Sequence, residues 1–402
     1  MEQKIKIIKN KMPVVLENQE DIGNIFIGTY PPVKCGIATF TKDLTTAVNL
    51  LNPNKLSEIV AVTPRGDKPT YPWEVSYKIE CDKKEDYIKT AEYINSEGFD
   101  AVCIQHEYGI FGGSDGEYIL DLAKRLEVPL VITLHTVLDT PSKNQKRIIK
   151  ELSEIAKVMV VMSQTPKERL IKNHEVEPGK IVIIPHGIPD LPFSSSELWK
   201  NLLDAEGKFV IGSFGLLNPN KGYEYLINAL PAVMEKHPQT IGLIAGETHP
   251  KVKEKQGEKY RESLIELTEK LGIKDRVYFL NKYLSLQELT STIQALDIYV
   301  APYANPQQIS SGALAYAIGC GRACVATPFA YAKEHLNDKR GILVPFNNSG
   351  KISEALNFLI ENPEEREKMA HSSYLLGRKM TWVKVADAYV DIFRFLRTVY
   401  GK

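Results

Sequence analysis

With 402 residues, the chain is longer than one ordinary hydrophobic core requires, so two domains are expected. Hydrophobic residues make up 43% and charged residues 25% of the sequence, as in soluble globular proteins. Fifty basic residues balance fifty acidic ones, which argues against a global field that would attract nucleic acid or an anionic membrane.

Segment 1–21, MEQKIKIIKNKMPVVLENQED, intersperses Lys and Glu with apolar residues and builds no signal-peptide core. No segment approaches the roughly 18 apolar residues of a membrane span. The five cysteines are scattered without a CxxC pair, which predicts reduced thiols and no zinc site. We therefore expect a cytoplasmic protein. The stretch KIKIIKNK leaves peripheral membrane contact open, although an edge strand or a frayed terminus explains it equally well.

Short β-branched runs alternate with longer helix-like segments along the whole chain. The runs lie at 24–28, 58–62, 101–105, 129–134, 158–162 and 181–184, and then at 209–214, 241–245, 276–280, 297–301, 323–327 and 341–345. Runs that are apolar on both faces suit buried parallel strands, and helical patterns between them indicate βαβ units. The predicted class is α/β, with two doubly wound, Rossmann-like parallel sheets.

The predicted linker is the Pro- and Ser-rich stretch around 186–206. This places a first domain at 1–190 and a second at 191–380, followed by an amphipathic terminal helix within 381–402. Two such domains facing each other would form a cleft at the carboxyl ends of both sheets, where open α/β folds bind ligands. Functional residues should therefore follow strands directly.

The segment GTYPPVKCGIATFTKDL (28–44) follows the first run. Gly36 precedes a predicted helix, whose first amides could bind phosphate or an anionic group of an acceptor. Lys34 in the same loop is a candidate contact for an acceptor or a sugar. A tight turn without function is the alternative, and the GxGxxG spacing of dinucleotide sites is absent.

Two further loops of the first half carry candidate residues. His135, directly after the run at 129–134, could bond a sugar hydroxyl in its neutral form, or could be a structural histidine. In IQHEYGIFGG, residues His106, Glu107 and Tyr108 end another run. They could line an acceptor pocket, or could simply cover the edge of the sheet.

The second half places a lysine after its first run and a polar loop after its fourth. Lys221 introduces a helix and could direct its ammonium at a diphosphate, or could be a solvated lysine. Exposed amides at Ser311 and Gly312, with Ser310 beside them, could bind phosphate. The small residues of ALAYAIGCG, which follow, indicate close packing of a helix on the sheet.

These motifs together resemble the family 4 retaining glycosyltransferases of the GT-B fold. The matching segments are PPVKCGIATFTKDL, ITLHT, IPHGI, FGLLNPNKG, GCGRACVATP and the terminal TWVKVADAYVDIF. Each motif is modest alone, but their order and spacing agree over nearly the whole length.

The resemblance implies roles for several of the candidates. The second domain would hold the nucleotide and its diphosphate, with Lys221 on the phosphates. His135 would lie near the donor sugar, and the loop around Gly36 would touch the phosphate or the acceptor. The terminal helix would cross back onto the first domain. No metal and no cofactor beyond the nucleotide sugar are expected.

The sequence departs from the family pattern at three positions. Gln308 and Tyr316 stand where the family usually has two glutamates. Gln308 would keep hydrogen bonds to the donor sugar without a charge. Tyr316 could offer only its phenol to the ribose of the nucleotide. Leu216 stands where the family often has an arginine, so another group must help to neutralise the phosphates.

The expected function is transfer of a hexose from a nucleotide diphosphate sugar to a carbohydrate or related hydroxyl, with retention of configuration. Mannose and glucose are favoured, and GDP-mannose is slightly preferred as donor. The alternative is a catalytically silent protein or regulatory subunit that binds nucleotide sugars. A GT-B epimerase or phosphorylase is a weaker third possibility.

Overall fold

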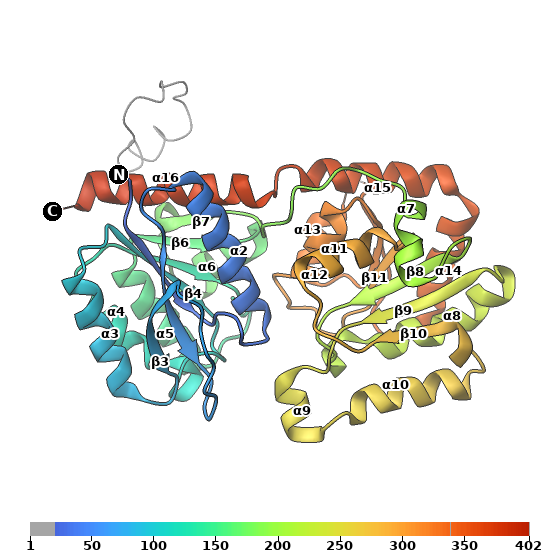
Figure 1. The fold of residues 1–402 in the computed structure, drawn as a ribbon, viewed down its shortest axis with the longest axis horizontal. Coiled ribbons are helices and arrows are strands. Elements are labelled where there is room, and N and C mark those ends of the chain that lie inside the picture. The colour runs from blue at the N-terminus through green and yellow to red at the C-terminus, as the bar shows by residue number, and fades with distance from the viewer. Residues whose placement is uncertain (1–20, 338, 402) are drawn as a thin grey trace. The chain divides into compact units, whose positions relative to one another are not determined.

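The computed structural model describes residues 21–337 and 339–401, and the chain divides into two compact units. The first unit contains the chain up to Gly187 together with the segment from Trp382 onward, and the second unit spans Ile188–Thr381. Figure 1 labels the helices and strands of both units.

The first unit is built on a parallel sheet of seven strands, counted among the described residues, in the order β3-β2-β1-β4-β5-β6-β7. The strands are β1 (Asn24–Gly28), β2 (Glu58–Thr63), β3 (Val75–Glu80), β4 (Ala101–His106), β5 (Leu130–Leu134), β6 (Val158–Val161) and β7 (Ile181–Ile183). Central β1 is completely buried and sets the register, with Phe26 beside Ile59 of β2 and Cys103 of β4. Burial on both faces explains why β1, β4, β5 and β6 are largely apolar.

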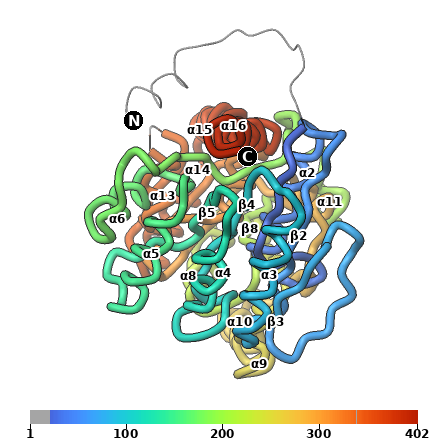
Figure 2. The backbone as a smooth tube through the Cα atoms, turned by 90° about the vertical axis from the view of Figure 1, so that its left-hand side faces the viewer, coloured from blue at the N-terminus to red at the C-terminus, as the bar shows by residue number. Residues whose placement is uncertain are grey.

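The helices of the first unit connect these strands and cover both faces of the sheet. They are α2 (Gly36–Leu51), α3 (Lys84–Ser96), α4 (Ile119–Ala123), α5 (Lys143–Ile155) and α6 (Gln164–His174). A capping box of Ser142 and Gln145 starts α5, satisfying two amides at the start of the helix. Figure 2 views the first unit end-on, with α3 and α4 in front.

The long terminal helix α16 (Trp382–Tyr400) belongs to the first unit and packs beside α2. Its apolar face shares one hydrophobic core with α2 and the sheet, and the ring of Phe393 lies 5.8 Å edge-on from Phe26. The buried hydroxyls of Tyr389 and Thr133 are 2.7 Å apart. The end of the chain is therefore part of the first core.

The second unit repeats the design with six parallel strands in its described part, ordered β10-β9-β8-β11-β12-β13. They are β8 (Phe209–Phe214), β9 (Thr240–Ala245), β10 (Val277–Leu280), β11 (Ile298–Ala301), β12 (Ala323–Ala326) and β13 (Gly341–Leu343). The predicted class of two doubly wound parallel sheets is confirmed. Of the described strands, β3 was missed by the sequence analysis.

Helices cover both faces of the second sheet. They are α7 (Glu197–Lys200), α8 (Tyr223–Lys236), α9 (Pro250–Gln256), α10 (Lys259–Lys270), α11 (Leu286–Gln294), α12 (Gly312–Gly319), α13 (Ala330–His335), α14 (Ser349–Glu361) and α15 (Pro363–Gly377). One core lies under α8, α10 and α14, and a second lies under α11, α12 and α13. The small residues of α12 let it sit in the second core, as its sequence indicates.

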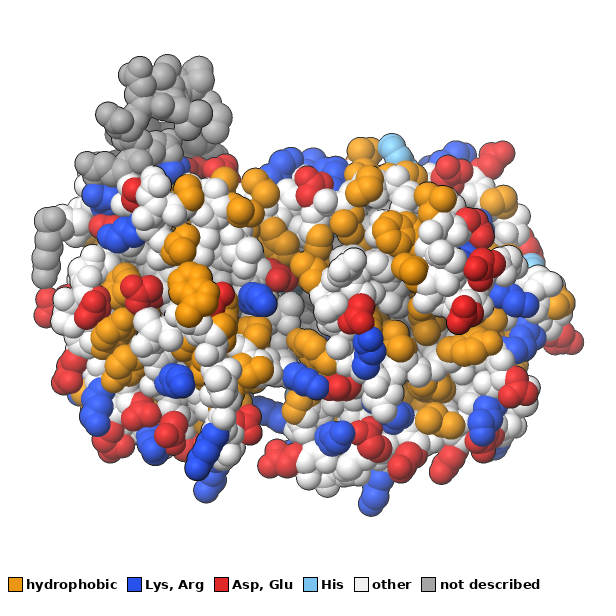
Figure 3. Space-filling model, in the orientation of Figure 1, with side chains coloured by type: hydrophobic (Ala, Val, Ile, Leu, Met, Phe, Trp, Pro, Cys, Tyr) orange, Lys and Arg blue, Asp and Glu red, His pale blue; other side chains and the backbone are white. Residues whose placement is uncertain are grey.

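The surface carries lysine and arginine interspersed with acidic residues on both units, without a large field of one sign on the visible face (Figure 3).

All five cysteines are free thiols, and Cys103, Cys320 and Cys324 are buried. Among the described residues, no helix is both long enough and apolar enough to span a bilayer.

Candidate functional site

All strand pairs are parallel, but the order in which successive strands are added reverses at one point in each sheet, and these two points position the candidate residues. In the first unit β1 lies between β2 and β4, and in the second unit β8 lies between β9 and β11. Loops leaving the carboxyl ends of such neighbouring strands diverge to opposite faces and leave a crevice for a ligand. The loops after β1 and β4, and those after β8 and β11, contain most of the predicted site residues.

The loop after β1 leads directly into α2. Cys35 caps this helix, with its sulfur accepting a hydrogen bond from the Ala38 amide at 3.4 Å. Gly36 is the exposed first residue of the helix, and no atom lies within 4 Å of the position that a β-carbon would occupy. Lys34 is exposed in the same loop. This helix start can therefore receive an anion without steric hindrance from a side chain at residue 36.

His135 lies at the end of β5, and only 7% of its surface is exposed. Its Nε2 is 3.0 Å from the Gln105 side-chain oxygen, and its ring stands edge-on to Phe40. Burial, assisted by the neighbouring histidines His186 and His106, lowers the pKa of His135 to about 3. The imidazole is thus neutral near pH 7, and with the Gln105 oxygen accepting, Nε2 carries the proton.

His106 and Tyr108 lie deeper than the sequence indicates. His106 is fully buried, and neither of its ring nitrogens has a hydrogen-bond partner in the described structure. Burial lowers its pKa to about 4, so it too is neutral near pH 7. Tyr108 packs edge-on against it at 5.1 Å, and its buried hydroxyl also has no partner. Glu107 accepts a 2.6 Å bond from the hydroxyl of Thr136, a residue that the sequence analysis did not select.

Lys221 ends a short 3-10 turn (Pro219–Lys221) before α8. Its ammonium lies 3.8 Å from the ring centre of Tyr303, in the loop after β11. Gly222 makes this approach possible because a β-carbon there would stand 2.2 Å from the Pro302 carbonyl oxygen. A 2.9 Å bond from the Ala304 amide to the Asn220 carbonyl joins the same two loops.

Tyr303 extends the contact from Lys221 to the start of α12. The residue is fully buried, and its hydroxyl lies 3.2 Å from the Ser311 hydroxyl. Ser311 caps α12 by accepting a 3.1 Å bond from the Leu314 amide. Lys221 and Ser311, both predicted site residues, are thus brought together by a tyrosine that the sequence analysis did not select.

The remaining residues of the loop after β11 differ in how far they are exposed. Gln308 is half-buried, and its side-chain amide donates a 2.9 Å bond to the Ser310 carbonyl within its own loop. Ser310 and Gly312 are also half-buried. Tyr316 is only 5% exposed and lies in the hydrophobic core under α12, which leaves little of its surface for a ligand.

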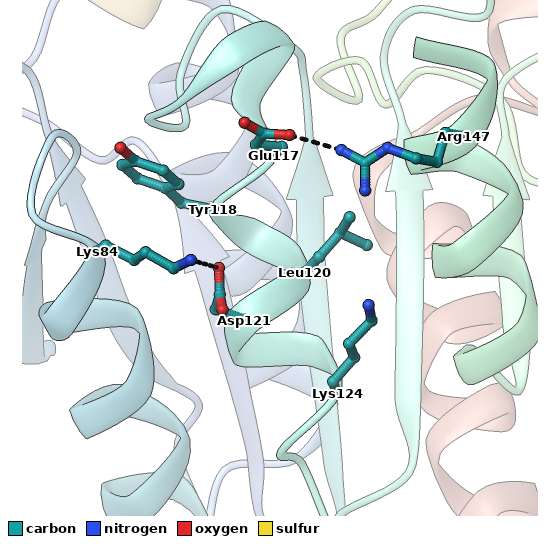
Figure 4. A pocket seen from close by; sticks show the side chains of 7 residues that line it. All are labelled: Lys84, Glu117, Tyr118, Leu120, Asp121, Lys124 and Arg147. Atoms are coloured by element: carbon teal, nitrogen blue, oxygen red, sulfur yellow. Dashed lines mark hydrogen bonds and ion pairs between the residues drawn. The ribbon is translucent and has the colours of Figure 1, made fainter. Parts of the chain in front are cut away.

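No group of three or more His, Cys, Asp or Glu side chains within residues 21–337 and 339–401 is placed to hold a metal ion. A surface hollow of about 250 Å³ lies elsewhere on the first unit, between α3, α4 and α5. Ion pairs of Lys84 with Asp121 and of Arg147 with Glu117 cross it (Figure 4). None of the predicted site residues lines this hollow, and its charges already neutralise one another.

Both halves of the chain match models of known glycosyltransferase families. Residues 195–375 match the family model described as Glycosyl transferases group 1, and residues 54–190 match the model described as Glycosyltransferase Family 4.

Similar proteins include several D-inositol 3-phosphate glycosyltransferases. The chain is 26% identical to that of Saccharomonospora viridis over 67% of its own length and 65% of the relative. The chain is 25% identical to the enzyme of the same name from Corynebacterium efficiens, over 72% of its own length and 70% of that enzyme.

Solved structures share the fold at lower identity. HepE of Anabaena, in complex with UDP and glucose, matches with a TM-score of 0.73 at 16% identity. The match covers 92% of this chain and 99% of the HepE chain. Sucrose-phosphate synthase of Thermosynechococcus elongatus has a TM-score of 0.74 at 17% identity, over 94% and 100% of the two chains. These likenesses identify the fold as GT-B.

The low pKa of His135 predicts a pH-dependent stability. The unfolded chain binds a proton near the usual pKa of about 6.5, whereas the folded chain does so only near 3. The unfolded state therefore holds more protons between these values. The contribution of His135 to the free energy of unfolding is full above pH 6.5 and is lost as the pH falls towards 3.

We expect His135→Gln to reduce the pH dependence of local stability between pH 6.5 and 4.5, because glutamine does not titrate. Hydrogen exchange at the amides of β5, measured at both pH values in wild type and variant, provides the test. Equal pH dependence in the two proteins would show that His135 is not buried in the neutral form.

Proposed function

Because the chain belongs to the glycosyltransferases of group 1 and family 4, we propose that it transfers a hexose from a nucleoside diphosphate sugar to a hydroxyl acceptor, with retention of configuration and without a metal. The observation that carries this proposal is the contact from Lys221 through Tyr303 to Ser311. It joins a cation to the capped start of α12 at the point where the strand order of the second sheet reverses. A diphosphate is the ligand that such a combination fits.

In this proposal the bond between the anomeric carbon and the diphosphate oxygen breaks through an oxocarbenium-like state. The acceptor oxygen forms the new bond on the same face of the sugar, and its proton passes to an oxygen of the departing phosphate. Lys221 would stabilise the negative charge that develops on that phosphate, which is electrostatic catalysis by a prearranged charge. No side-chain nucleophile is required, so catalysis depends on positioning.

The first unit would supply neutral hydrogen-bonding groups to sugar hydroxyls. The imidazole of His135 is uncharged near pH 7 because burial and its histidine neighbours lower its pKa. Glu107, held by Thr136, and the exposed Lys34 would contribute to the acceptor side. A neutral imidazole suits hydroxyls, which carry no charge to be matched.

The donor we propose is a sugar on GDP or UDP, with GDP-mannose slightly preferred. Two kinds of similar protein widen the set of candidate substrates. HepE binds UDP and glucose, and other relatives are D-inositol 3-phosphate glycosyltransferases. An inositol phosphate therefore joins the simple sugars as a candidate acceptor.

A second candidate function is nucleotide-sugar binding without turnover. It is motivated by Gln308, whose amide is engaged within its own loop, and by Tyr316, which is buried in the core. Neither residue replaces the charge of the glutamate that the family usually has at its position.

The deciding experiment incubates purified protein in EDTA with GDP-mannose, UDP-glucose and other nucleotide sugars, and follows nucleotide release by chromatography. Mannose, glucose, short oligosaccharides and D-inositol 3-phosphate serve as acceptors, and the anomeric signal of any product is read by NMR. Release from one donor with a retained anomer supports transfer. Nucleotide binding without release under every acceptor would support the silent protein instead.

Lys221→Ala should lower turnover about 100-fold or more, because loss of one prearranged donor to a developing charge has an effect of this size. The matched control is Lys259→Ala, which removes an exposed lysine of α10 in the same unit and should leave turnover unchanged. Full activity of the Lys221 variant would contradict its assignment to the diphosphate.

Gln308→Glu should lower turnover rather than restore a family-like site. The glutamine amide donates to the Ser310 carbonyl, whereas a carboxylate there would face another acceptor and repel it. The value of kcat/KM for the donor, compared with that of wild type, measures the effect. A rise in kcat/KM would indicate that the site retains the geometry of the usual glutamate.

A further inference from the structure

The loops after β8 and β9 remain hydrogen-bonded beyond the ends of their strands. The Leu217 amide donates to the Glu247 carbonyl at 2.8 Å, and the His249 amide donates back to the Leu217 carbonyl at 2.9 Å. Leu217 and Thr248 form a parallel bridge. Because of this pairing, His249 in the loop after β9 lies next to the loop after β8, which ends in Lys221.

A close approach of two backbones starts this pairing. Gly246 has φ +139°, and a β-carbon on it would stand 2.1 Å from the Gly215 carbonyl oxygen. The Gly215 amide donates to the Ala245 carbonyl at 2.9 Å. Only glycine fits at 246, so the position of the loop after β9 relative to the loop after β8 is fixed by sterics.

A buried arginine and a half-buried glutamate hold the loop after β9. Arg261 is 5% exposed and donates to the Gly246 carbonyl at 3.3 Å and to the Thr248 hydroxyl oxygen at 3.2 Å. The Thr248 hydroxyl donates to Glu258, which also pairs with Arg261. Hydrogen bonds from Thr248 and Lys253, and then from Arg261, lower the pKa of Glu258 to about 2. The segment before His249 is thus prearranged.

The imidazole of His249 has a defined proton arrangement. Its Nδ1 accepts a 3.2 Å bond from the Lys251 amide, capping α9. In the neutral ring the proton must then sit on Nε2, at the opposite edge. Burial, Lys251 and Lys221 together lower the pKa of His249, so the ring is neutral near pH 7.

A diphosphate at Lys221 requires more than one donor. Leu216 and Leu217, in the loop that ends in Lys221, have no polar side-chain atom and cannot donate. We propose that His249 supplies a second donor, with its Nε2–H donating to a phosphate oxygen of the diphosphate held by Lys221. The inference rests on the proposed function, and it identifies a phosphate-binding residue in the loop after β9.

A helix cap alone would also explain the Nδ1 contact, so the test must separate the two roles. Asparagine is among the best residues for capping a helix. His249→Asn therefore keeps a side-chain acceptor for the Lys251 amide and removes the Nε2–H donor. The matched control is His371→Asn, the same change at an exposed histidine of α15 in the same unit.

The measurement is isothermal titration calorimetry of wild type and variants with UDP and with GDP, alongside thermal melting without nucleotide. We expect His249→Asn to weaken binding of the preferred diphosphate about tenfold, as loss of a hydrogen bond to a charged group does. Its Tm should stay close to that of wild type, and His371→Asn should change neither quantity.

Each other outcome has a definite meaning. Equal affinity of wild type and His249→Asn, while Lys221→Ala loses affinity, would overturn the role of His249 and leave the proposed function standing. A large fall in Tm together with weaker binding would assign His249 to the cap and overturn the inference. Absence of UDP and GDP binding by wild type would overturn the inference and the proposed donor site together.

Discussion

Two backbone contacts that leave no room for a side chain determine where the charged and polar groups of the second unit lie. Gly222 meets the Pro302 carbonyl, and Gly246 meets that of Gly215. The first contact brings Lys221 onto the Tyr303 ring, and the second carries the loop of His249 to the same strand ends. Because β9, β8 and β11 are neighbours in the sheet, three separate loops contribute to one small region.

The two units offer different kinds of chemistry to a ligand. The first contains the imidazole of His135, which burial keeps neutral, and a carboxylate already bonded to Thr136. The second presents the ammonium of Lys221 and a capped helix start. Uncharged sugar hydroxyls match the first set and phosphate oxygens match the second.

Burial decided which features the sequence could reveal. Strands that are apolar on both faces were recognised, whereas β3 lies at the sheet edge and alternates exposed with partly buried residues. Lys221 and Ser311 stood out because they follow strands, and the structure links them. Tyr303 did not stand out, because its place in the loop after β11 does not reveal that its ring lies against Lys221. For Tyr316 the sequence could not tell which side of α12 it occupies, and the structure buries it.

The steric demands at Gly222 and Gly246 also determine how this protein could diversify. Any substitution there would push apart the loops that gather the polar groups, whatever sugar is used. Asn305 and Pro306, by contrast, are exposed beside the same site, and Leu216 is half-buried without a polar atom of its own. Directed evolution of a new donor preference would therefore find positions 216 and 305–306 tolerant of substitution, whereas Gly222 and Gly246 would have to remain glycine.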